Sequence, residues 1–155
     1  MKTEKQLQIR YTIFESLADL PTEAQTLMAE AVAARHNAYA PYSKFKVGAA
    51  VLVGNGKIFI GSNQENAAFP SGLCAERVAI YQASTQCPDE IIKMIAISGT
   101  AEDPTGQPVS PCGACRQVMA EFFEPSAKVI LIAKGGKTVV MTVEELLPYS
   151  FRELK

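Results

Sequence analysis

The chain has 155 residues, of which 48% are hydrophobic and 20% charged, and this fits one compact soluble domain with a buried core. The formal net charge of −1 gives no basic surface for nucleic acid. No apolar run approaches the roughly 20 residues that cross a bilayer. Four cysteines without a secretory signal lead us to expect reduced thiols in a cytoplasmic protein, and the single histidine excludes sites built from several histidines.

The N-terminal part predicts a strand followed by a helix. Residues 6–13 alternate between apolar and polar side chains, which is typical of a half-buried strand. Thr22 and Gln25 have the spacing of a capping box, and the alanine-rich run from residue 23 to about residue 38 favours a helix. His36 lies near the end of this helix, where we expect a surface role and no part in catalysis.

Two β-rich runs follow, at residues 46–53 and 57–62, and Asn55-Gly56 between them predicts a hairpin. The return strand leads into four consecutive polar residues, 63–66. Such a run is usually a solvated loop. Its position at a strand end, about ten residues before the first cysteine motif, makes it a candidate for binding.

The second half predicts helices and strands in alternation: a helix from residue 73 to Cys87-Pro88, a strand at 91–98, a loop at 99–111, a helix at 112–123, and hairpin strands at 128–133 and 138–141 joined by 134–137. Thr142 and Glu145 form a capping box that opens a short last helix. The complete order predicts an α/β fold, a three-layer α/β/α sandwich with a mixed sheet between helical layers.

Three of the four cysteines lie in two short motifs, Cys74-Ala75-Glu76-Arg77 and Pro111-Cys112-Gly113-Ala114-Cys115-Arg116-Gln117. Both motifs lie where a helix is expected to begin, and the helix dipole there favours thiolates. Three thiolates can hold one zinc ion and leave its fourth position open for water, as in catalytic sites. Glu76, two residues after the first thiolate, could reach that water without binding the metal.

The pairing of Cys-x-Glu with Pro-Cys-x-x-Cys is the signature of zinc deaminases. The chain resembles the cytidine deaminases, in particular the short homotetrameric members with three cysteine ligands. The matching blocks are residues 42–50, 63–69, 74–77 and 111–117, together with the ending 145–148. The resemblance implies a zinc-dependent deaminase domain at residues 22–155. It leaves residues 1–21 as an N-terminal extension, which we expect to hold an edge strand.

The resemblance also implies roles for individual residues. Cys74, Cys112 and Cys115 would bind one Zn²⁺ per subunit, Glu76 would relay protons, and Arg77 would donate hydrogen bonds to ligand thiolates. The implied substrate-binding residues are Phe45, Asn63, Gln64, Glu65, Asn66, Ala67, Ala68, Phe69, Ala75 and Phe151. Among these, Asn63 and Glu65 would bind the ribose 3′-hydroxyl, the Ala75 backbone would bind the pyrimidine, and Phe151 would cover the base in a neighbouring subunit's site.

The function that the resemblance implies is hydrolytic deamination of cytidine and 2′-deoxycytidine to uridine and 2′-deoxyuridine plus ammonia, as in pyrimidine salvage. The expected substrate is a free nucleoside, with no nucleic-acid or membrane partner, and the expected assembly is a cytoplasmic homotetramer.

Three alternatives remain. A deaminase of a cytosine-containing antibiotic such as blasticidin S would not need the Asn63 and Glu65 pair for a free ribose. A non-enzymatic zinc-binding domain would normally close the metal site with a fourth protein ligand. A redox protein could use Cys112 and Cys115 as a thiol pair, and a metal-content measurement would distinguish it. Cys87 lies outside both motifs, and we interpret it as a free thiol.

Overall fold

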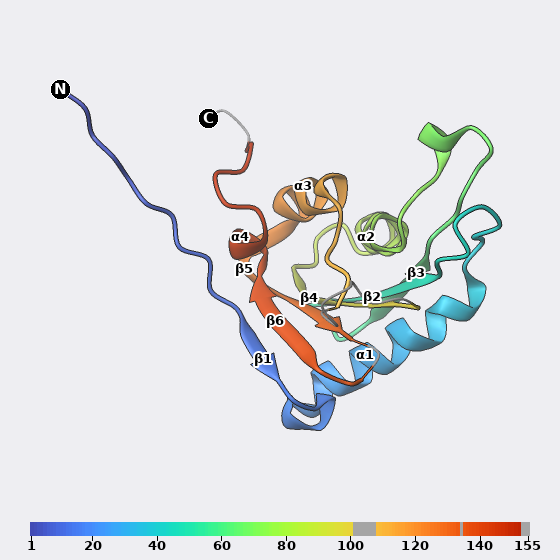
Figure 1. The fold of residues 1–155 in the computed structure, drawn as a ribbon. Helices are drawn as coiled ribbons and strands as arrows, with labels where there is room; N and C mark the ends of the chain where they lie inside the picture. The colour runs from blue at the N-terminus through green and yellow to red at the C-terminus, as the bar shows by residue number, and fades with distance from the viewer. Residues whose placement is uncertain (101–107, 134, 153–155) are drawn as a thin grey trace.

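The computed structural model describes residues 1–100, 108–133 and 135–152, and these form one six-stranded sheet covered by helices on both faces (Figure 1). The strands are β1 (Thr12–Phe14), β2 (Val47–Val53), β3 (Ile58–Ser62), β4 (Ile92–Gly99), β5 (Phe123–Ile132) and β6 (Thr138–Thr142). The helices are α1 (Thr22–Ala34), α2 (Ala75–Gln86), α3 (Gly113–Phe122) and α4 (Val143–Leu146), with 3-10 turns at Leu17–Asp19, Arg35–Asn37 and Phe69–Ser71. The predicted order of elements and the predicted α/β/α sandwich are confirmed.

The strand order is β1-β6-β5-β4-β2-β3. In this sheet β4 and β5 pair in parallel, with Ile95 opposite Val129, and every other neighbouring pair is antiparallel. The sheet is therefore mixed, as predicted. Helix α1 covers one face, whereas α2, α3 and α4 cover the other (Figure 1). Among the described helices, none is long and apolar enough to span a membrane.

Each face of the sheet has its own hydrophobic core. In β2, Ala49, Val51 and Val53 pack under α2 and α3, whereas Ala50 and Leu52 pack against α1. This explains the continuous apolar run in β2, because a strand covered on both faces has no polar side.

The strand predicted at residues 6–13 is wrong for most of its length. Only Thr12–Phe14 form a strand, which pairs with β6 at the edge of the sheet and has Thr12 opposite Val140. Strand β6 ends at Thr142 and α4 begins at Val143, so the sheet offers no strand beside the residues before Arg10. The apolar side chains of Leu7, Ile9 and Tyr11 are exposed.

The capping box predicted at Thr22 is also wrong. Pro21 is the N-cap of α1, and its carbonyl oxygen accepts hydrogen bonds from the amides of Ala24 and Gln25. The Gln25 side chain donates instead to the carbonyl oxygens of Ala18 and Leu20. The helix ends at Ala34, earlier than expected, and His36 is exposed in the following 3-10 turn.

The other predicted helix and strand boundaries differ less from those of the structure. The Thr142–Glu145 capping box is confirmed. Helix α2 begins at Ala75, and β5 begins at Phe123, five residues before the expected start, because the chain passes directly from α3 into the strand. Residues 101–107 of the predicted 99–111 loop and residue 134 of the predicted hairpin lie outside the described residues.

Two glycines let the helices lie directly on the sheet. A Cβ atom added to Gly48 of β2 would be 2.0 Å from the Ala31 carbonyl oxygen of α1. A Cβ atom added to Gly61 of β3 would be 2.4 Å from the Ala75 carbonyl oxygen of α2. Since backbone atoms cannot move aside like a flexible side chain, both positions require glycine. Gly61 therefore sets how closely the first turn of α2 approaches the sheet.

We expect Gly61→Ala to lower the free energy of unfolding by about 1–3 kcal/mol, because the added methyl group overpacks the contact with α2. Urea unfolding of the purified variant measures this change. Gly113→Ala is the control, since a Cβ atom there meets no atom within 4 Å. Wild-type stability of Gly61→Ala would contradict the close approach.

Candidate metal centre and active site

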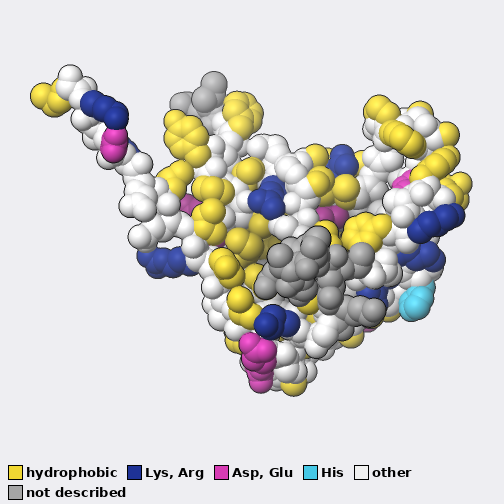
Figure 2. All heavy atoms as spheres, viewed as in Figure 1, with side chains coloured by type: hydrophobic (Ala, Val, Ile, Leu, Met, Phe, Trp, Pro, Cys, Tyr) yellow, Lys and Arg dark blue, Asp and Glu magenta, His cyan; other side chains and the backbone are white. Residues whose placement is uncertain are grey.

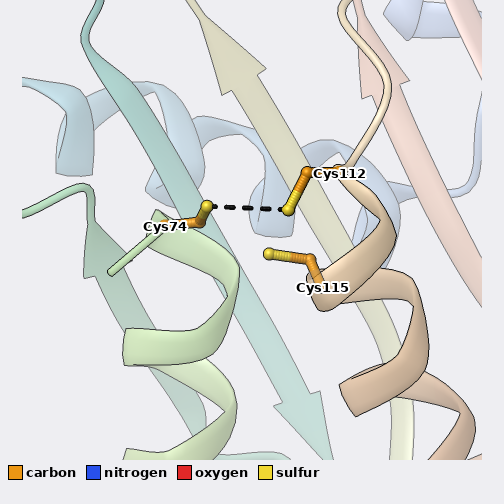
Figure 3. Close-up of side chains that lie close together, drawn as sticks. All are labelled: Cys74, Cys112 and Cys115. Atoms are coloured by element: carbon orange, nitrogen blue, oxygen red, sulfur yellow. Dashed lines mark hydrogen bonds between the residues drawn. The ribbon is translucent and has the colours of Figure 1, made fainter. Parts of the chain in front are cut away.

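The N-terminal ends of α2 and α3 meet, and they bring the two cysteine motifs together (Figure 3). Cys74 is the N-cap of α2, Cys112 is the N-cap of α3, and Cys115 lies in the first turn of α3. The Sγ atoms of all three lie within 4.8 Å of one another, and those of Cys74 and Cys112 are 3.8 Å apart. Residues 38 positions apart in sequence thus form one cluster of thiols.

The cluster fits a zinc ion. In a tetrahedral site with Zn–S bonds of about 2.3 Å, two sulfur atoms lie about 3.8 Å apart. In the part of the chain that the structure describes, no fourth histidine, cysteine or acidic residue joins the three thiols. The donor set is thus that of a zinc site whose fourth position stays open to a small molecule.

Hydrogen bonding within the cluster shifts the pKa values of Cys74 and Cys115 in opposite directions. A hydrogen bond from the Cys115 thiol lowers the pKa of Cys74 to about 5, and Arg77 contributes to the same effect. The same hydrogen bond raises the pKa of Cys115, which acts as the donor. These contacts favour the thiolate form of Cys74, and metal binding would displace the proton that Cys115 retains.

Arg77 lies beside the cluster. Its Nη2 donates to the Cys74 Sγ atom over 3.6 Å. Its Nε is buried and has no hydrogen-bond partner among the described residues. A positive charge at this place offsets part of the negative charge that three thiolates would bring to one divalent ion.

Glu76 is a buried carboxyl group, with 5% of its surface exposed. Burial raises its pKa to about 7, and the negative charge of Cys74 acts in the same direction. The side chain lines a cavity of about 210 Å³ together with Phe45, Ala75, Cys74 and Cys112. A carboxyl group with this pKa can both take up and release a proton near neutral pH.

A second, wider cleft of about 570 Å³ lies beside the first. Asn63 and Cys74 line both spaces, so the cavity and the cleft share a boundary. The cleft is also lined by Glu65, Phe69 and Arg77.

Glu65 and Asn63 are both held by the segment that leads into β2 and by its first residue, Val47. The Glu65 carboxylate accepts from the amides of Tyr42 at 2.9 Å and Ser43 at 3.2 Å, and from the Ser43 hydroxyl. The Ser43 hydroxyl is the largest of several donors that lower the pKa of Glu65. The Asn63 side chain donates to the Phe45 carbonyl oxygen and accepts from the Val47 amide, each at 2.8 Å.

The remaining candidate residues are exposed. The side chain of Gln64 donates to Ser62, that of Asn66 accepts from the Ala68 amide, and both Gln64 and Asn66 are exposed. Ala67 and Ala68 are exposed as well, and the Phe69 ring lies edge-on to Tyr42. Phe151 is 73% exposed and lines neither the cavity nor the cleft, while its carbonyl oxygen accepts from Gln117.

Sequence reasoning did not single out the two residues that hold Glu65. Tyr42 and Ser43 act through backbone amides and one hydroxyl, and their turn lies 22 or more residues from Glu65 in sequence. The available signal was the Pro41-Tyr42-Ser43 turn just before β2, since serine in such turns often bonds to nearby polar groups.

Comparisons with known proteins agree with this site. The family model of the cytidine and deoxycytidylate deaminase zinc-binding region matches residues 21–132. Cytidine deaminase of Halalkalibacterium halodurans is 42% identical over 129 residues, 83% of this chain and 94% of the relative. Cytidine deaminase of Sporosarcina psychrophila is 45% identical over 129 residues, 83% and 91% of the two chains.

A comparison with solved structures also finds a cytidine deaminase. The crystal structure of cytidine deaminase from Burkholderia pseudomallei superimposes with a TM-score of 0.75 at 42% sequence identity, covering 81% of this chain and 97% of the other. Since the family model spans more than half of the chain and includes both cysteine motifs, this protein belongs to the zinc-binding cytidine and deoxycytidylate deaminase family.

Proposed function

We propose that this protein is a zinc-dependent cytidine deaminase that converts cytidine and 2′-deoxycytidine to uridine and 2′-deoxyuridine, with release of ammonia. The observation that carries the proposal is the cluster of three thiols around an open metal position, beside the buried carboxyl group of Glu76. Relatives at 42% and 45% identity that bear the name cytidine deaminase support it.

The chemistry divides between the metal and the protein. Zinc held by the three thiolates would lower the pKa of a water molecule and so supply the nucleophile. Glu76 would take the proton from that water and deliver it to N3 of the cytosine ring. The water oxygen would bond to C4 as N3 gains that proton. Glu76 would then move the remaining proton of the new C4 hydroxyl group to the amino nitrogen, so that the bond from C4 to this nitrogen breaks, a carbonyl group forms at C4 and ammonia leaves.

The two adjoining spaces suit the two halves of a nucleoside. The smaller cavity, with Phe45 and the Ala75 backbone, would take the pyrimidine next to Glu76. The wider cleft would take the sugar, where Glu65 and Asn63 would bind the 3′-hydroxyl. Gln64, Asn66 and Phe69 line this cleft, and we propose that Ala67 and Ala68 between them also lie along the sugar. A polymer carries a phosphodiester at that hydroxyl, and the Glu65 carboxylate would repel it.

The alternatives are less well supported. An antibiotic deaminase would not need the carboxylate that Tyr42 and Ser43 hold in the cleft. A closed structural zinc site would have a fourth ligand, and the described residues place none beside the thiols. A redox pair would leave the buried Glu76 without a role.

Several finer features belong to the same proposal. They are a role in pyrimidine salvage in the cytoplasm, a deaminase domain at residues 22–155 after an extension at 1–21, and assembly as a homotetramer. Exposed apolar side chains support assembly: Tyr149 and Phe151 lie near the C-terminus, and hydrophobic side chains gather on the flank next to the N-terminal segment (Figure 2).

We expect Glu76→Gln to keep the zinc ion and the fold but to lower kcat by about 10²–10⁴-fold, since an amide cannot relay protons. Cys112→Ser should lose zinc and activity together. Metal content by atomic emission and ammonia release from cytidine, measured on the same samples, separate the two effects. A zinc-loaded Glu76→Gln protein with the wild-type rate would show that Glu76 is not the proton relay.

The substrate proposal predicts that cytidine is turned over well, whereas free cytosine and internal cytosines of an oligonucleotide are not. Glu65→Gln should lower kcat/KM for cytidine by about tenfold or more, because the amide accepts more weakly from the 3′-hydroxyl. The matched control is 3′-deoxycytidine, on which the variant and the wild type should be equally slow. Ammonia release at equal base concentrations measures all of these rates. Efficient deamination of the oligonucleotide would refute the nucleoside proposal.

If the protein forms the proposed homotetramer, Phe151 contributes to the active site of a neighbouring subunit. The active protein should then have a light-scattering mass of four chains, and Phe151→Ala should raise KM for cytidine several-fold. Tyr149→Ala, which removes an aromatic ring that is 97% exposed two residues away, serves as the matched control. A fully active monomer would contradict the proposal.

A further inference from the structure

The side chain of Arg116, the residue after Cys115, makes three hydrogen bonds. Its Nε donates to the Pro111 carbonyl oxygen at 2.8 Å, its Nη1 to the Leu146 carbonyl oxygen at 3.0 Å, and its Nη2 to the Ser110 hydroxyl at 2.6 Å. Its backbone amide donates to the Cys112 carbonyl oxygen at 3.0 Å. All three nitrogens of the guanidinium group are therefore engaged with two separate segments.

The two segments are the lead into α3 and the end of α4. Ser110 and Pro111 come directly before Cys112, and Leu146 is the last residue of α4, 30 residues after Arg116. A planar guanidinium group with donors in fixed directions can hold such acceptors at set positions, whereas a lysine ammonium would act as a single point of attachment. Arg116 thus fastens the residues before Cys112 to another helix.

Cys112 needs such a support more than the other two thiols do. Cys115 is fully buried in the core, and the Cys74 sulfur accepts a hydrogen bond from Arg77. Cys112 is exposed, and as the N-cap of α3 it makes no side-chain capping hydrogen bond. Its position therefore depends on the backbone around it, and the Arg116 side chain bonds to the Pro111 carbonyl oxygen directly before the Cys112 amide.

Gln117, the residue after Arg116, links α3 to the C-terminal segment. The Gln117 side chain donates to the Phe151 carbonyl oxygen at 3.1 Å. Two consecutive residues of α3 thus hold the end of α4 and the segment that follows it. Because α3 also carries Cys115, the second zinc motif and the C-terminal segment are joined through one turn of helix.

We propose that Arg116 is a positioning residue that fixes the Cys112 thiol for metal binding by fastening Ser110 and Pro111 to the end of α4. The inference rests on the proposed zinc site and adds a residue that touches neither metal nor substrate. Removing Arg116 loosens one of three ligands. The metal then leaves faster and the reacting groups are aligned less well, while the sugar cleft formed around Glu65 keeps its shape.

The test compares zinc-loaded wild-type protein with Arg116→Met and Arg116→Lys. Zinc release to 4-(2-pyridylazo)resorcinol gives a readout without turnover, and cytidine kinetics give kcat and KM separately. For Arg116→Met we expect about tenfold faster zinc release and about tenfold lower kcat, the usual effect of losing support around a metal ligand, with KM within about twofold. Arg116→Lys should lie between Arg116→Met and the wild type.

The matched control is Arg35→Met. Arg35 also donates to backbone carbonyl oxygens, those of Gly99 at 2.9 Å and Val32 at 3.4 Å, but it lies at the end of α1 on the other face of the sheet. It should lower the unfolding temperature yet release zinc at the wild-type rate. Equal zinc release from the two methionine variants would reduce Arg116 to a general stabilising role and overturn the inference.

The outcomes also separate this inference from the proposed function. Wild-type release kinetics and kcat in Arg116→Met would overturn the positioning role alone, provided that the wild-type protein holds one zinc per chain and deaminates cytidine. Wild-type protein that holds no zinc would overturn both.

Discussion

The site depends on two helix N-termini that meet on one face of the sheet. Helix α2 leads into β4 and α3 leads into β5, and these two strands are parallel neighbours. Helices that precede parallel strands and cover the same face run in the same direction, so their N-termini lie at the same edge of the sheet. The positive ends of both dipoles then point at the three sulfur atoms, which favours the thiolates that zinc requires.

Two carboxyl groups near this edge have opposite environments. Burial and the Cys74 charge raise the pKa of Glu76 to about 7, whereas the Ser43 hydroxyl and two backbone amides lower that of Glu65. A carboxyl group whose pKa lies near neutral suits proton transfer, and one that stays ionised suits acceptance of a hydrogen bond. The proposed division of roles between proton relay and sugar contact thus follows from the surroundings of each carboxyl group and not from the residue type.

The sequence alone predicts those parts of the molecule that short-range chemistry controls. The Asn55-Gly56 hairpin, the Thr142–Glu145 capping box and the clustering of three cysteines each depend on neighbours within a few positions or on ligand chemistry. The strand at residues 6–13 fails because its partner β6 ends at Thr142, which the local alternation does not reveal. The bonds from Asn63 to the backbone at residues 45 and 47 likewise depend on strand pairing.

Cysteine at the N-caps of α2 and α3 lowers the stability of these helices. Serine, threonine, aspartate and asparagine at an N-cap stabilise a helix by about 1 kcal/mol through a side-chain hydrogen bond to the first turn. Helices α2 and α3 both begin with cysteine at this place, and neither cysteine makes such a bond. Other contacts must hold the two ends in place, and the structure supplies one for each. Gly61 lets α2 lie directly on β3, and Arg116 ties the start of α3 to α4. The thiols are thereby left free for the metal.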